Sequence, residues 1–170
     1  MESLFSQNLI STFFQLDLYI MQLSEQQNNG TVLNDIEQVA NTDYYTISYS
    51  YSKNRFYLTI RGFWKNPDVI SNYVNDWRKA MLLAIPNFTL LTDATNAETY
   101  PPSVMTVHNE AQQVVIDAGL MQVAEVLPKS AFLKFQAELL SENSQMPCSK
   151  FNNIELAEEW LDSLRKENIV

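Results

Sequence analysis

The chain has 170 residues, a formal net charge of −9 at pH 7, and only one histidine and one cysteine. Its apolar fraction, 46%, is that of an ordinary globular protein. The negative charge disfavours binding along nucleic-acid phosphates, because that affinity comes largely from lysine and arginine. One histidine and one cysteine cannot supply the ligands of a Cys/His metal site, and Cys148 can form no intrachain disulfide. We therefore expect no metal, no cofactor and no nucleic-acid partner.

The first 42 residues are predicted to form a helical extension. Apolar residues three and four positions apart in segment 3–26 predict one face of a helix; they include Phe5, Leu9, Phe13, Leu16 and Ile20. Polar residues interrupt this run, so we expect no membrane span. A basic signal-peptide stretch is also absent, which leads us to expect a cytoplasmic protein. A short helix is expected over residues 31–41.

The apolar stripe of residues 3–26 must be buried against something. It can pack on the chain's own sheet, or it can pair with another copy of the chain. We predict the second arrangement, a homodimer through residues 3–26.

The remainder, residues 43–170, is predicted to be a single α/β domain. Two segments rich in aromatic and β-branched residues, "YYTISYSY" and "RFYLTIRGFW", predict a β-hairpin with its turn at "SKN". Helices and strands then alternate, which favours a mixed, mainly parallel sheet covered by helices. Helices are expected at 67–85, 101–118, 130–143 and 154–167, and strands at 88–94 and 121–128. Gly119 is expected to cap the second of these helices.

This order of elements resembles the STAS-like superfamily, whose type members are sporulation anti-anti-sigma factors. The chain is most similar to an uncharacterised bacterial branch. The resemblance is carried by "YLTIRGFW" (57–64), "FTLLTDAT" (88–95), "HNEAQQVVIDAGLMQVAEV" (108–126) and "FNNIELAEEWL" (151–161). It implies a right-handed β-α superhelix and a cytoplasmic, non-enzymatic role.

In regulatory members of that superfamily, a partner kinase phosphorylates a serine at the start of a helix after a central strand. The resemblance places Ser103 at this position. The family's usual Asp-Ser motif is replaced here by "YPPSVM". The residues alone support a second interpretation, in which two prolines start the helix and Ser103 is a solvated residue of its first turn.

Asp93 and His108 complete this candidate recognition or phosphorylation site. Asp93 ends a buried strand, where a carboxylate can line a ligand crevice or bind its own turn. His108 flanks the apolar face of the helix at 101–118, so we expect it to be half-buried with a hydrogen-bonded ring. An enzyme would need Asp93 and His108 within hydrogen-bond reach around a cleft. We predict no catalytic set.

Two further groups of residues each have two interpretations. Phe63 and Trp64, at a strand end, can stack on a ligand or partner, or can cap the core. Three glutamates open the last helix, where they can act as an acid and a base, or can simply be stabilised by the helix dipole without any catalytic role; they are Glu155, Glu158 and Glu159.

We therefore expect a non-enzymatic, cytoplasmic interaction module that binds a protein partner. The alternative is a module that binds a small apolar, lipid-like ligand in a pocket between helices and sheet. The aromatic-rich hairpin and the apolar stripe of residues 3–26 favour this alternative.

Overall fold

The structure is a computed structural model, and it describes residues 35–127 and 130–167. The expected helix over 3–26, with the homodimer surface assigned to it, lies outside the described residues. The described elements are β1 (Ile36–Asn41), β2 (Tyr45–Ser50), β3 (Arg55–Gly62), η1 (Pro67–Ile70), α2 (Tyr73–Ala80), β4 (Phe88–Ala97), α3 (Pro102–Asp117), β5 (Leu120–Val126), α4 (Ala131–Ser144), β6 (Cys148–Phe151) and α5 (Ile154–Glu167).

One six-stranded sheet contains all the described strands, in the order β1-β2-β3-β4-β5-β6. The β1–β2 and β2–β3 pairs are antiparallel, and β3 to β6 run parallel to one another. The predicted hairpin is confirmed, since Ser50 pairs with Arg55 across its turn and Tyr45 pairs with Ile60 at its open end. The prediction of an α/β fold with a mixed sheet is confirmed as well.

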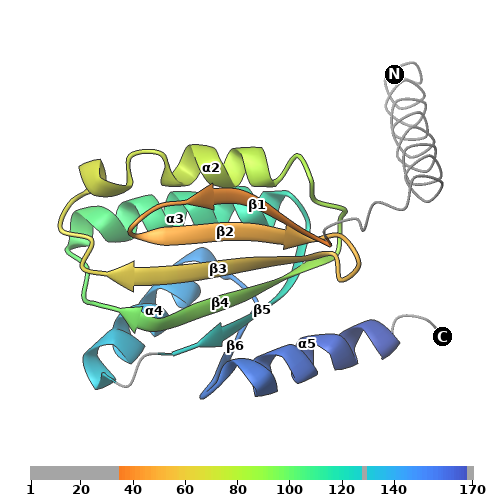
Figure 1. Ribbon diagram of the computed structural model, residues 1–170. Helices are drawn as coiled ribbons and strands as arrows, with labels where there is room; N and C mark the ends of the chain where they lie inside the picture. Colours follow the sequence, from red (N-terminus) through yellow and green to blue (C-terminus); the bar gives the residue numbers. More distant parts are fainter. Residues whose placement is uncertain (1–34, 128–129, 168–170) are drawn as a thin grey trace, which may run out of the picture. The chain divides into compact units, whose positions relative to one another are not determined.

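Because the parallel strands are added to the sheet in chain order, their connections all pass over the same face. Helices α2, α3 and α4 cover that face, and α5 crosses the opposite one (Figure 1). The larger core, under α2 and α3, is rich in aromatic side chains such as Trp64, Tyr73 and Trp77. The smaller core, under α5, consists of Leu91, Ala124, Val126, Ala157 and Leu161.

The short helix expected over residues 31–41 is wrong in the part that the structure describes. Residues 36–41 form β1, which pairs with β2 in antiparallel register. The sheet therefore begins inside the segment that we assigned to the helical extension. Pairing with β2 buries Ala40 and half-buries Val39, and these tertiary contacts outweigh the helical spacing of the apolar residues.

Two other boundaries differ from the prediction. The helix expected over 67–85 is divided into η1 and α2, with Ser71 and Asn72 between them. Serine and asparagine compete with the backbone for hydrogen bonds, which disfavours helix interiors. Cys148, which lies between the helices expected at 130–143 and 154–167, begins the edge strand β6 and pairs with Val123.

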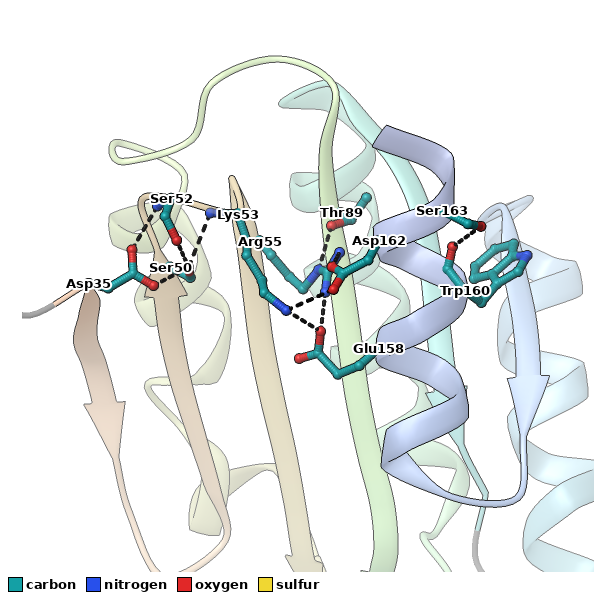
Figure 2. A network of polar contacts seen from close by, with 10 residues as sticks. All are labelled: Asp35, Ser50, Ser52, Lys53, Arg55, Thr89, Glu158, Trp160, Asp162 and Ser163. Carbon is teal, nitrogen blue, oxygen red and sulfur yellow. Dashed lines mark hydrogen bonds and ion pairs between the residues drawn. The ribbon is translucent and has the colours of Figure 1, made fainter. Parts of the chain in front are cut away.

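A buried arginine holds α5 against the sheet. Arg55 on β3 is 0% exposed, and its Nη2 lies 2.9 Å from Asp162 of α5 while Nη1 contacts Glu158. Its Nε donates to the Thr89 hydroxyl at 3.0 Å. Lys53, at the hairpin turn, reaches the same two carboxylates at 2.9 and 3.2 Å (Figure 2). Glu158, which we had explained by the helix dipole, therefore belongs to an ion-pair network.

Gly62 and Gly119 both have a positive φ, but they differ in what surrounds them. Gly119 follows α3 with φ +95°, and an added Cβ would lie 3.3 Å from the Cα and Cβ of Pro86. Gly62 has φ +64°, and an added Cβ would meet nothing within 4 Å.

We predict that Gly119→Ala lowers the free energy of unfolding more than Gly62→Ala, which should cost about 1–2 kcal/mol from backbone strain alone. Urea denaturation measures both, and equal losses would contradict the role assigned to Pro86.

The network under α5 generates a second prediction. The pair Glu158→Gln and Asp162→Asn leaves the Arg55 charge buried without a carboxylate, so we expect a loss of roughly 3–5 kcal/mol of unfolding free energy. Adding Arg55→Met to that double variant removes the unpaired charge and should restore much of the loss. Urea denaturation measures the free energy of unfolding of the double and triple variants. A triple variant no more stable than the double variant would refute the prediction.

Candidate functional site

A cavity of about 50 Å³ lies between the sheet and the helices that cover its larger core. Its floor is formed by β3, β4, β5 and β6, and its roof by α2, α3 and α4. A water molecule needs roughly 10–15 Å³ of such space, so the cavity suits a molecule of only a few non-hydrogen atoms. Apolar side chains make up much of the wall, among them Leu58, Ile60, Leu90, Val115, Val123 and Met146.

Two polar side chains of α3 reach the cavity from positions one helical turn apart. His108 is 4% exposed, and its Nε2 has no hydrogen-bond partner among the described residues. Gln112 lines the same wall, and its buried Oε1 likewise has none. Residues four apart share one face of a helix, so the two side chains point in the same direction. Buried polar groups without a partner are uncommon in proteins, and each one calls for an explanation.

Aromatic rings hold His108 in place. Its imidazole stacks on Trp64 with the ring centroids 4.7 Å apart and the planes 4° apart. The rings of Tyr73 and Tyr100 lie at 5.4 and 5.0 Å. Trp64 is itself fixed by its indole N–H, which donates to the Arg61 carbonyl at 3.1 Å. Burial lowers the pKa of His108 to about 4, so the imidazole is neutral at physiological pH.

The floor of the cavity carries one carboxylate. Glu125 of β5 pairs with Lys150 of β6, and the thiol of Cys148 lies 3.7 Å from the same oxygen, Oε2. Burial, followed by the charge of Glu125, raises the pKa of Cys148 to about 12. Burial also opposes the charge on Lys150, but the nearby Glu125 outweighs it and raises the pKa of that ammonium group. Cys148 is therefore a neutral thiol, and Glu125 and Lys150 form an ion pair.

Gln136 of α4 fastens the loop that closes one side of the cavity. Its side-chain amide donates to the Tyr100 carbonyl at 2.9 Å and accepts from the Tyr100 backbone N–H at 3.3 Å. The Tyr100 ring lines the cavity and lies beside His108. Because Gln136 is buried, these two bonds tie the loop between β4 and α3 to α4.

The structure does not bring Asp93, Ser103 and His108 together. Thr92 lines the cavity, so the next strand residue, Asp93, faces the opposite side of the sheet from His108. Asp93 instead binds its own strand end, where it accepts from the Thr95 N–H at 3.0 Å and hydroxyl at 2.6 Å. Ser103 is exposed in the first turn of α3 and lies about 140° around the helix from His108.

The expectation for His108 needs correction. We expected a half-buried ring with its nitrogens bonded, whereas the ring is fully buried and Nε2 lacks a partner within the described ranges. The cause is Trp64, which stacks on the imidazole and is itself buried in the core, in agreement with the second interpretation of that residue. Phe63, its neighbour, is 48% exposed and points away from this core.

Sequence reasoning missed the other polar residues of the cavity, although two of them left a signal. Glu125 interrupts the apolar segment "MQVAEV", where a charge inside a buried strand is unusual. Gln112 follows His108 by four positions, the spacing of one helix face. Cys148, and Lys150 beside the cavity, gave no signal, because their strand has only four residues.

Searches against family models, curated proteins and solved structures found no match for this chain. Within the residues that the structure describes, no helix is long and apolar enough to cross a membrane. The same residues contain no group of three or more His, Cys, Asp or Glu side chains arranged to hold a metal ion.

The buried histidine predicts a pH-dependent stability. Its pKa is about 4 in the folded chain, while the ordinary value of 6.5 applies once the chain unfolds. Above pH 6.5 both states are neutral and the histidine has no effect; below it the unfolded state binds the proton more readily, so stability falls until about pH 4. The full loss should approach roughly 3 kcal/mol.

Urea denaturation between pH 7.5 and 4 tests this prediction against His108→Gln, which cannot titrate. Carboxylates contribute equally to both proteins, so the difference between their curves isolates the histidine. Parallel curves would contradict the assigned pKa.

Proposed function

We propose that the chain is a non-enzymatic binding module whose cavity between the sheet and helices α2 to α4 holds a small molecule. The observation that carries this proposal is a pair of side chains that line the cavity, His108 and Gln112, each of which has a buried atom without a partner among the described residues, Nε2 and Oε1. Leaving such an atom unpaired costs about 1–3 kcal/mol. A ligand that bonds to both atoms would remove that cost.

The composition of the wall supports the same proposal. Ligand sites are commonly concave and mostly apolar, with a few convergent polar groups. Here an apolar floor from β3 to β5 meets the polar atoms of α3 and the carboxylate of Glu125. The size of the cavity favours a molecule of a few non-hydrogen atoms over the lipid-like ligand that the sequence suggested.

A protein partner is the second candidate function. Two apolar side chains in the connection between α2 and β4 support it, since Leu82 is 85% exposed and Ile85 is 55% exposed. Exposed apolar pairs of this kind occur at protein contacts, although single ones are ordinary. Membership of the STAS-like superfamily, phosphorylation of Ser103, a cytoplasmic location and a homodimer through residues 3–26 stay predictions.

Ligand-observed NMR with a library of small fragments tests the cavity proposal. We expect some fragments to bind the wild-type chain and to lose binding to Ala111→Leu, because Ala111 is 2% exposed and its larger replacement fills the cavity. Thr106→Leu provides the matched control, since it enlarges an exposed position of the same helix.

Circular dichroism and a urea melt establish that both variants fold. If every fragment that binds the wild type also binds Ala111→Leu with unchanged affinity, the cavity is not the binding site and the proposal fails.

A further inference from the structure

The chemical groups around the cavity point to the charge of its ligand. This inference rests on the proposed function, because it concerns the same site. Five lining side chains contain an ionisable group: Tyr73, Tyr100, His108, Glu125 and Cys148. His108 and Cys148 are neutral at physiological pH, as described above, and burial raises the pKa of both tyrosines. Glu125 is therefore the one member of this lining that bears a charge, and that charge is negative.

The charge of Glu125 affects other residues of the cavity wall as well as its ion-pair partner Lys150. The negative charge of Glu125 adds to burial in raising the pKa of Tyr73 on α2 and of Tyr100 in the β4–α3 loop. Lys150 and Cys148 both contact one oxygen, Oε2, so neither occupies Oε1. Lys150 itself is not part of the cavity wall.

The unpartnered atoms favour a ligand rich in hydrogen-bond donors. Gln112 Oε1 is an acceptor, and His108 Nε2 is an acceptor when the ring proton is on Nδ1. The aromatic side chains of Tyr73, Trp77 and Tyr100 also line the cavity, and a ligand can meet a ring face there. Such faces attract cations, because the ring quadrupole places negative charge above the plane.

We propose that the cavity binds a small organic cation of the amidinium or primary ammonium class, whose N–H groups donate to Gln112, His108 and Glu125. An anion of the same size meets the Glu125 carboxylate, while Lys150, which pairs with that carboxylate, lies outside the wall, so we expect an anion not to bind. A neutral molecule of the same shape can satisfy Gln112 and His108 but gains less from Glu125. Lys150, as the resident cation beside Glu125, competes with the ligand for the carboxylate.

Acetamidinium, acetamide and acetate test this assignment, since they share one planar shape of four non-hydrogen atoms and differ in charge. We measure their dissociation constants by NMR titration of the full chain at pH 7. Acetamidinium should bind more tightly than acetamide, and acetate should not bind. Glu125→Gln should weaken acetamidinium about tenfold or more and leave acetamide within about threefold, because hydrogen bonds to charged groups are the stronger ones.

Lys150→Met is the decisive companion variant, because it leaves the Glu125 carboxylate in place and removes its competitor. Acetamidinium should then bind more tightly than it binds the wild type. Any of three results would overturn the assignment. Acetamidinium does not bind the wild type, acetamide or acetate binds it as tightly as acetamidinium or more tightly, or acetamidinium binds Lys150→Met more weakly than it binds the wild type.

The fragment experiment with Ala111→Leu separates this inference from the proposed function. If some fragments bind the wild type but not Ala111→Leu, and acetamidinium does not bind, the cavity is a binding site but its ligand is not a small cation. No fragment that depends on the cavity would refute the proposed function itself.

Discussion

A guanidinium group with no exposure to solvent must be surrounded by acceptors, and Arg55 imposes this constraint on one whole face of the sheet. An unpaired buried charge costs several kcal/mol, so the helix that supplies its carboxylates cannot be absent from the folded chain. Glu158 and Asp162 are four residues apart and therefore lie on the same face of α5. The same face carries Ala157 and Leu161 into the smaller core. Apolar burial thus attracts α5 to the sheet, and the ion pairs fix its orientation there. A purely apolar face would not specify that orientation.

On the opposite face of the sheet, under α2, α3 and α4, some buried polar atoms have no hydrogen-bond partner among the described residues. There His108 is buried and Gln112 is half-buried, and each has a buried atom without a partner among the described residues. Another buried polar group of this core does have partners: the Tyr45 hydroxyl donates to Asp76 at 2.8 Å, and Lys79 reaches the same carboxylate at 3.0 Å. Asn109 Oδ1 of α3 is also buried without a hydrogen-bond partner, but among the described residues only His108 and Gln112 combine such an atom with a place in the cavity wall. That combination makes the cavity the candidate site.

Local patterns in the sequence were sufficient for most of the fold. The hairpin, the two central parallel strands and helices α3 to α5 follow from alternation, helical spacing and Gly119. The edge strands β1 and β6 were missed, because each is short and depends on the register of its neighbour. A four-residue segment has too few alternations to distinguish a strand from a loop.

The candidate site was less predictable than the fold, because its residues come together only in three dimensions. His108 was singled out correctly as unusual, but its partners in sequence, Asp93 and Ser103, face elsewhere. What joins His108 to Glu125 is the pairing of β4 with β5 and the packing of α3 over both strands. No spacing along the chain encodes that juxtaposition.

Strand order explains why the site must lie beneath the helices. In open α/β sheets, ligands commonly bind where successive connections pass to opposite faces and leave a crevice at the strand ends. Here the strands follow one another in chain order and α2, α3 and α4 lie on one face, so no such crevice arises. A ligand site in this fold has to be made by residues that leave space between the sheet and the helices. Small side chains such as Ala111 and Ala137 in the roof leave that space, and His108, Gln112 and Glu125 give it polarity. The identity of these few side chains, rather than the topology, therefore determines what the domain can bind.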